Sequence, residues 1–268
     1  MNREELISEI KAKQSLLCVG LDTSIDKLPI GIEKSIDGVL QFNKSIIDVT
    51  KDYSVAYKIN TAFYEQYGKL GWQCMEETLQ YIPENCFTIA DAKRGDIGNT
   101  SSMYAKAFFE NMNFDSITVA PYMGEDSLLP FFQFEGKWVI CLGLTSNKGS
   151  KDFQTLEYEG EKLYEIVMKT VSKWGRTDNL MFVTGATKAE DLNTLRQMFP
   201  QHFFLVPGVG AQGGTVEDVC KNALTSFGGL LINSSRGILY ASSGEDYMEK
   251  ARNEAMTLQL QCSKAMGQ

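Results

Sequence analysis

Short apolar segments that alternate with longer amphipathic segments constrain the fold more than any other feature of this sequence. The apolar segments are rich in Val, Ile, Leu and Phe. Nearly continuous hydrophobicity of this kind is typical of parallel strands that are covered on both faces. The segments predicted to be strands are residues 15–22, 54–60, 86–91, 116–120, 138–143, 180–184, 203–207 and 229–233.

The segments between these strands have the periodicity of amphipathic helices, for example "IDGVLQFNKSIIDVTK" and "LYEIVMKTVSKWG". Eight strands that alternate with about eight helices predict an α/β protein, a single-domain (β/α)8 TIM barrel over residues 1–268. A doubly wound parallel sheet is the alternative. That fold usually has fewer strands and a glycine-rich turn after the first one, and "GLDTSID" is not such a turn.

Charge and composition limit the partners and the location of the protein. A net charge of −8 argues against nucleic acid and membrane surfaces as partners, although a locally positive pocket could still hold a small anion. The N-terminal "MNREELISEIKAKQS" is too charged for a secretion signal, and no apolar run is long enough to span a membrane. We therefore expect a cytoplasmic protein.

The cysteines and the histidine restrict the chemistry. The six cysteines form no CxxC pair, so we expect reduced, mostly buried thiols rather than disulfides or a zinc site. His202 is the only histidine and lies just before a predicted strand, where we expect a surface residue. A single histidine argues against Ser-His-Asp and Cys-His catalysis and leaves acid–base chemistry to Lys, Asp and Glu.

Polar residues concentrate where the predicted strands end. In a barrel, the loops that follow the strands form the active site. The strand ends carry Asp22, Lys58, Asn60, Asp91, Lys93, residues 145–147, residues 207–214 and residues 233–237. This concentration of polar residues at one end of the predicted strands is the first indication of function.

The segment "TIADAKRGDIGNTS", residues 88–101, places four charges within six residues. Strand alternation puts Asp91 and Lys93 on one face, toward the barrel mouth, and Arg94 on the other, where we expect a structural role. A strand-end ion pair that caps the barrel is the alternative, and Lys58 at the end of the preceding strand makes it less favoured. Asp96 follows the turn at Gly95 and is expected to point away from the cluster of its own subunit. Candidate N-caps for the next helix are Asn99, Thr100 and Ser101.

Glycine-rich loops follow the last two predicted strands, "VPGVGAQGG" at residues 206–214 and "INSSRGI" at residues 232–238. Loops at these positions commonly hold phosphate in barrels. Arg236 could make a bidentate contact to phosphate oxygens and Gln212 a neutral hydrogen bond. Flexible turns without a ligand are the alternative.

A polar stretch, "LGLTSNKGSKDF", follows the fifth strand. Thr145 and Ser146 are the hydroxyls nearest the strand end and could read a polar ring edge. A surface loop without a ligand is an equally good interpretation.

These motifs together resemble one family. "DAKRGDIGNT" matches the D-x-K-x-x-D-I-x-x-T signature of orotidine 5′-phosphate decarboxylases, and "CVGLD", "YKIN", "PGVGAQGG" and "NSSRGI" extend the resemblance along most of the chain. The pattern is most similar to the longer bacterial branch of the family. The shorter D-x-K-x-x-D pattern is shared with related sugar-phosphate decarboxylases and synthases.

The resemblance implies conversion of orotidine 5′-monophosphate to UMP and CO2 without metal or organic cofactor. Lys58, Asp91, Lys93 and Asp96 are similar to the family's charge array, with Lys93 stabilising and protonating the carbanion at C6 of the pyrimidine. It also implies a homodimer, in which the neighbouring site receives Asp96, Ile97 and Thr100.

The resemblance also assigns the substrate contacts. Asp22 and Lys58 are similar to the family's ribose ligands, and Gln212 and Arg236 to its phosphate ligands. The pyrimidine-contacting hydroxyl falls at Thr145 or Ser146. The remaining expected substrate-binding residues are Asn60, Pro207 and Gly213.

Two other functions fit parts of the pattern. A sugar-phosphate aldolase or decarboxylase on the same barrel usually needs Mg²⁺, and no acidic metal-ligand set is obvious in the sequence. A non-catalytic nucleotide-binding barrel has no need for a buried, protonated lysine between carboxylates.

Overall fold

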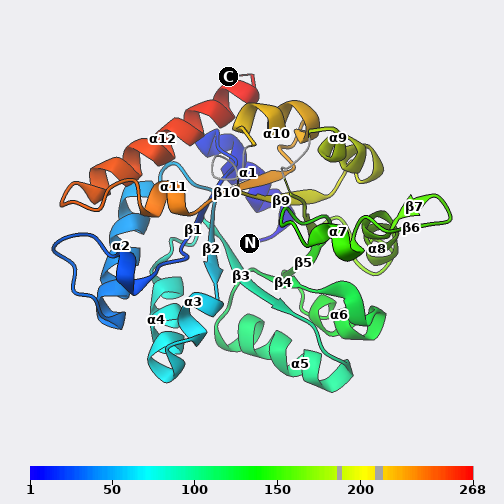
Figure 1. Cartoon of the computed structure of the whole chain (residues 1–268), viewed down its shortest axis with the longest axis horizontal. Helices are drawn as coiled ribbons and strands as arrows, with labels where there is room; N and C mark the ends of the chain where they lie inside the picture. Colours follow the sequence, from blue (N-terminus) through cyan, green and yellow to red (C-terminus); the bar gives the residue numbers. More distant parts are fainter. Residues whose placement is uncertain (186–188, 209–213, 268) are drawn as a thin grey trace.

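The strands form a closed parallel barrel in the computed structural model, which describes residues 1–185, 189–208 and 214–267 (Figure 1). The strand order around the barrel is β1-β10-β9-β8-β5-β4-β3-β2. Closure pairs β1 with β10, with Cys18 opposite Asn233. The barrel strands are β1 Leu17–Gly20, β2 Ala56–Asn60, β3 Phe87–Arg94, β4 Ser116–Val119, β5 Trp138–Leu142, β8 Leu180–Val183, β9 Phe203–Pro207 and β10 Leu230–Ser234. The barrel prediction is therefore confirmed, and the doubly wound alternative is excluded.

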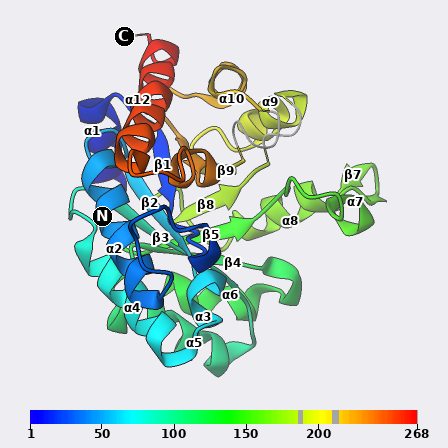
Figure 2. The ribbon, with the colours of Figure 1, turned by 60° about the vertical axis from the view of Figure 1, so that its left-hand side comes forward.

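Helices surround the barrel, as Figure 1 shows. They are α1 Arg3–Lys13, α2 Ile36–Thr50, α3 Ala62–Glu65, α4 Gly68–Tyr81, α5 Gly98–Lys106, α6 Glu125–Phe132, α7 Ser150–Phe153, α8 Leu163–Val171, α9 Ala189–Met198, α10 Val216–Ala223, α11 Arg236–Leu239 and α12 Tyr247–Ala265. Short helical turns occur at η1 Ile25–Lys27, η2 Ala107–Asn111 and η3 Pro121–Met123. After β5, α7 and a small hairpin of β6 Glu157–Tyr158 and β7 Glu161–Lys162 extend away from the barrel (Figure 2).

The amino-terminal end of the barrel is closed by packed aromatic rings and by the first residues of the chain. The Trp138 ring makes edge-on contacts with Phe87 and Phe203, at 6.0 and 6.1 Å between centroids. The indole of Trp138 donates to the Met1 carbonyl, and Arg3 donates to the Gln201 carbonyl. Because this end is filled, a ligand reaches the barrel from the carboxyl ends of the strands.

His202 is buried, so the prediction of a surface position is wrong. Its side chain is packed against Phe182 and Phe199, and the residue is 9% exposed. Arg196 from α9 donates to the His202 carbonyl and holds this segment against the barrel. Neither ring nitrogen has a hydrogen-bond partner among the described residues. The position of His202 just before a strand gave no sign that these side chains would bury it.

The prediction of the N-cap of α5 is also wrong. The helix begins at Gly98, and Ile97 precedes it without a side-chain cap. The Ser101 hydroxyl instead bonds the carbonyl of Asp96 and, at 2.9 Å, that of Ser127 on α6. The hydroxyl thus ties the β3–α5 loop to the neighbouring helix. The prediction of buried cysteines is confirmed, since all six are buried and free.

Replacing His202 with Leu should flatten the pH dependence of stability. Burial, with Arg3 and Arg196 nearby, lowers the pKa of His202 to about 4. The unfolded chain, with an ordinary histidine pKa of about 6.5, therefore binds the proton first, and stability falls as the pH drops from about 6.5 toward 4. From pH 7 to pH 5 the histidine accounts for a loss of about 2 kcal/mol. Urea unfolding at both pH values should show this loss in the wild type but not in His202→Leu, and equal losses would contradict the assignment.

Candidate active site

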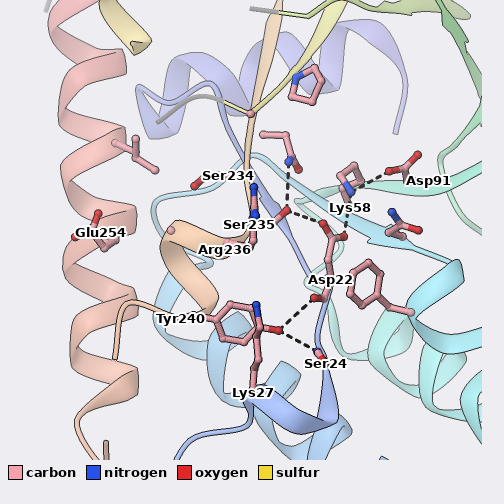
Figure 3. Close-up of a pocket in the computed structure, with 17 residues that line it drawn as sticks. Asp22, Ser24, Lys27, Lys58, Asp91, Ser234, Ser235, Arg236, Tyr240 and Glu254 are labelled. Carbon is pink, nitrogen blue, oxygen red and sulfur yellow. Dashed lines mark hydrogen bonds and ion pairs between the residues drawn. The ribbon is translucent and has the colours of Figure 1, made fainter. Parts of the chain in front are cut away.

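A cavity of about 680 Å³ opens at the carboxyl ends of β1, β2, β3, β9 and β10 (Figure 3). The opposite end of the barrel is filled, so this is where the strand-end polar residues converge. Of the predicted site residues, those that line the cavity are Asp22, Lys58, Asn60, Asp91, Pro207 and Arg236. The prediction that the polar strand ends face one mouth is confirmed for these residues.

Four side chains from three neighbouring strand ends form a chain of alternating charges. The Lys58 ammonium lies 3.1 Å from Asp22 Oδ1 and 3.1 Å from Asp91 Oδ2. Lys93 Nζ lies 2.6 Å from Asp91 Oδ1. Figure 3 shows Lys58 between the two carboxylates. The side chain of Lys58 is 6% exposed and that of Lys93 is 49% exposed, so the chain runs from a buried ammonium to an accessible one.

The pKa values of the two inner groups follow from this geometry. Burial by itself lowers the pKa of Lys58, but the carboxylates of Asp22 and Asp91 outweigh it and the pKa is raised. Burial likewise favours a protonated Asp91, and the two ammonium groups overcome it and lower the pKa to about 2. Each buried charge is thus stabilised by its neighbours, and both groups are ionised at neutral pH.

Thr118 on β4 completes the environment of Asp91, and sequence reasoning missed it. Its hydroxyl donates to Asp91 Oδ1 at 3.0 Å and accepts the backbone N–H of Lys93 at 2.9 Å. The β3–β4 register shifts between Ala90 and Arg94, and Lys93 adopts a φ of 46°. Because of this irregularity the backbone N–H of Lys93 needs a partner outside the regular strand pairing, and the Thr118 hydroxyl is that partner. A polar residue at an inward position of a neighbouring strand is the signal that could have identified it.

Arg94 leaves the mouth, as predicted. Its guanidinium pairs with Glu65 and lies over the rings of Tyr104 and Phe108. These contacts tie β3 to helices outside the barrel. They fit the structural role expected for this residue.

Asp96, Ile97 and Thr100 lie beyond the charge chain of their own subunit. Asp96 Oδ1 accepts the N–H of Ile97 at 2.7 Å, and within the described ranges no ion pair involves Asp96. Ile97 is 58% exposed, and Thr100 is exposed on the first turn of α5. The expectation that Asp96 points away from the cluster of its own subunit stays a prediction.

The two candidate pyrimidine hydroxyls differ in their hydrogen bonds. Thr145 Oγ1 donates to Asn147 Oδ1 at 2.6 Å and accepts from Gln154 Nε2 at 2.8 Å, so its hydrogen-bonding capacity is largely used. The Ser146 hydroxyl has no hydrogen-bond partner in the described part of the chain. Ser146 is therefore the more available hydroxyl, although neither residue lines the cavity.

The predicted phosphate loops are described in part. Pro207, Gly208 and Arg236 line one side of the cavity, and Arg236 begins α11 as an exposed side chain. Gln212 and Gly213 lie outside the described residues. Next to Arg236, Ser235 donates to Asp22 Oδ2 at 2.9 Å, a contact that the sequence did not predict.

Over residues 1–185, 189–208 and 214–267, no group of three or more His, Cys, Asp and Glu side chains is placed to hold a metal ion. No helix in these ranges has the length and apolar composition needed to cross a membrane.

Fold and site together define a class, a (β/α)8 barrel with a lysine–carboxylate network in a polar cavity at the carboxyl ends of its strands. The chain belongs to the orotidine 5′-phosphate decarboxylase / HUMPS family, whose sequence model matches residues 15–251. The family predicted from the motifs is thereby confirmed.

Individual relatives are similar to this protein over nearly its whole length. It is 55% identical to the orotidine 5′-phosphate decarboxylase of Flavobacterium johnsoniae, over 97% of this chain and 96% of that protein. The solved Leishmania donovani OMP decarboxylase superposes with a TM-score of 0.82 at 36% identity, over 97% of this chain and 99% of the other. The Leishmania donovani UMP synthase gives 0.84 at 38% identity, and the match covers 97% of this chain and 57% of that longer one.

Proposed function

We propose that this protein decarboxylates orotidine 5′-monophosphate to UMP and CO2, the last step of de novo pyrimidine nucleotide synthesis. The observation that carries the proposal is the Asp22–Lys58–Asp91–Lys93 chain, which holds ionised groups at the mouth of a closed barrel. The full-length similarity to proteins named orotidine 5′-phosphate decarboxylase supports it.

Lys93 is the proposed catalytic acid. When the bond between C6 and the carboxylate breaks, the electron pair stays on C6, and an ammonium beside C6 stabilises the carbanion that develops. Lys93 Nζ then gives a proton to C6, which completes UMP, and the amine regains a proton from solvent. Its exposure fits this role, because it is the member of the chain that a ligand can reach most easily.

Asp91 and Lys58 prepare Lys93 for this step. Asp91 is held ionised by Lys58 and Lys93 and accepts a hydrogen bond from Thr118, so it places a full negative charge 2.6 Å from the Lys93 ammonium. The same carboxylate lies where the substrate carboxylate would approach, and its repulsion would favour the loss of CO2. Asp96 of the neighbouring subunit is proposed to be the second carboxylate beside Lys93.

The substrate contacts follow the cavity. We assign the ribose hydroxyls to Asp22 and Lys58, and the phosphate to Arg236 with Gln212. Ser146 is the hydroxyl that we assign to the pyrimidine. Asn60, Pro207 and Gly213 complete the proposed substrate-binding set. Because the phosphate lies far from C6, its binding energy can be used to assemble the site.

The closest alternative is a sugar-phosphate reaction, since the D-x-K-x-x-D pattern of residues 91–96 is shared with sugar-phosphate decarboxylases and synthases. Full-length similarity to decarboxylases favours the nucleotide substrate. A pure nucleotide sensor is the less favoured alternative, because binding alone gives no reason to keep Lys58 and Asp91 as a buried ion pair.

We also propose a cytoplasmic homodimer, in which residues 1–268 of each chain form one domain and neither nucleic acid nor membrane is a partner. Near Asp96, the elements α5, η3 and α6 expose a group of large apolar side chains, which a second copy would cover. These are Ile97, Met103, Tyr122, Met123 and Leu129. A dimer through this surface would bring Asp96, Ile97 and Thr100 to the neighbouring cavity.

Lys93→Ala should abolish turnover while UMP still binds. The loss of ultraviolet absorbance as orotate becomes uracil measures turnover with EDTA present, and calorimetry measures UMP binding. We expect rapid metal-independent decarboxylation by the wild type, and a kcat at least about 1,000-fold lower in the variant, because the stabilising charge and the proton donor are lost together.

Lys69→Ala, which removes an exposed lysine on α4, is the matched control and should leave turnover unchanged. Equal losses of turnover and UMP binding in Lys93→Ala would contradict the catalytic role. A wild type without activity would move the chemistry to a sugar phosphate.

The shared site can be tested by mixing two inactive variants. Lys93→Ala and Asp96→Asn protomers, exchanged at random, should restore activity to about a quarter of the sites, because one site of each mixed dimer receives both intact residues. No recovery would place Asp96 in its own subunit. Mixing Lys93→Ala with Asp91→Asn is the control, since both residues lie in one site and no recovery is expected.

A further inference from the structure

A second path of hydrogen bonds reaches Asp22 from the last strand of the barrel. The Cys18 thiol donates to Asn233 Oδ1 at 3.7 Å, and Asn233 Nδ2 donates to Ser235 Oγ at 3.3 Å. The Ser235 hydroxyl in turn donates a hydrogen bond to Asp22 Oδ2 at 2.9 Å. Figure 3 shows Ser235 beside Asp22, on the side away from Asp91. Three uncharged side chains therefore hold Asp22 from the side of β10, and the proposed function gives none of them a role.

The path is directional because its first member cannot ionise readily. Burial raises the pKa of the Cys18 thiol to about 12, so the thiol stays protonated and acts as a donor. Donation to Oδ1 of Asn233 turns the Nδ2 group toward Ser235. The serine oxygen accepts that hydrogen bond, and its single O–H is free to donate a hydrogen bond to Asp22.

Asp22 is held at both carboxylate oxygens. Oδ1 pairs with Lys58 at 3.1 Å, and Oδ2 accepts from Ser235. A carboxylate with only one of these partners could rotate about its terminal torsion, which is broad for aspartate. With both partners the plane of the carboxylate is fixed, while its side chain remains 20% exposed at the cavity.

The close approach of Ser235 depends on a glycine on the opposite strand. A Cβ at Gly20 would lie 1.9 Å from Ser235 Oγ and 3.1 Å from Asn233 Oδ1. Any other residue at this position would displace the serine hydroxyl. Gly20 ends β1, two residues before Asp22, so the same strand end carries the carboxylate and leaves room for its partner.

We infer that Ser235 is a positioning residue that orients Asp22 toward the sugar hydroxyls and thereby favours ribonucleotides over ligands that lack these hydroxyls. The inference rests on the proposed function, in which Asp22 contacts the ribose. Ser235 directly precedes Arg236 and is the N-terminal residue flanking α11. Two adjacent residues thus carry the proposed phosphate ligand, Arg236, and the serine that orients Asp22.

Binding of UMP and of 2′,3′-dideoxyUMP to Ser235→Ala tests this role. The two ligands share base and phosphate and differ only in the hydroxyls that Asp22 is proposed to bind. If Ser235 acts through Asp22, the variant should bind UMP roughly tenfold more weakly, the scale of one lost hydrogen bond to a charged group. Its affinity for dideoxyUMP should change by no more than about twofold, as in a double-mutant cycle.

Ser235→Thr keeps the donor and should retain the preference for UMP. Ser242→Ala is the matched control, because it removes another serine–aspartate bond, to Asp246, outside the cavity. Equal weakening of both ligands, or no weakening of either, would overturn the role of Ser235. Failure of the proposed function would appear differently, as a wild type that does not turn over orotidine 5′-monophosphate and binds neither ligand, and the positioning role would fall with it.

Discussion

Lys58 is the buried charge on which the rest of the site depends, since it joins the two carboxylates that organise the cavity. An ammonium that is 6% exposed would cost several kcal/mol if unpaired, and Asp22 and Asp91 at 3.1 Å remove that cost. The positions of Asp22 and Asp91 depend in turn on their ion pairs with Lys58. The outer end of the chain, Lys93, is 49% exposed and lies 2.6 Å from a carboxylate that stays ionised.

The barrel makes this arrangement possible because its two ends are built differently. At the amino-terminal end, Trp138 and its aromatic neighbours fill the interior, and Arg196 donates to the carbonyls of Phe199, His202 and Gly229. At the carboxyl end, β1, β2 and β3 stand side by side and bring Asp22, Lys58 and Asp91 within ion-pair distance. Closure of β10 onto β1 then brings Ser235 to the same carboxylate from the other side.

The sequence predicted the barrel, its strand segments and the Asp91–Lys93 pair, because apolar runs and strand alternation are local signals. It did not predict Thr118 or Ser235, whose hydroxyls matter only through the neighbours that strand pairing and closure bring to them. The burial of His202 depends on Phe182, Phe199 and Arg196, and no local pattern reports such cover. The sequence left open whether Thr145 or Ser146 contacts the pyrimidine, and the structure adds that Thr145 Oγ1 already accepts a hydrogen bond from Gln154.

The measurement that tests the account most directly is an NMR titration of the lysine ammonium groups in ¹⁵N-labelled protein, for the wild type and for Asp91→Asn. In the wild type, Lys58 should keep its proton to higher pH than exposed lysines, whose pKa is about 10.4. In Asp91→Asn, Lys58 keeps Asp22 but loses one of its two carboxylate partners, and its pKa should fall. A Lys58 that titrates with the exposed lysines, or that does not respond to the loss of Asp91, would contradict the view that paired carboxylates sustain the buried charge.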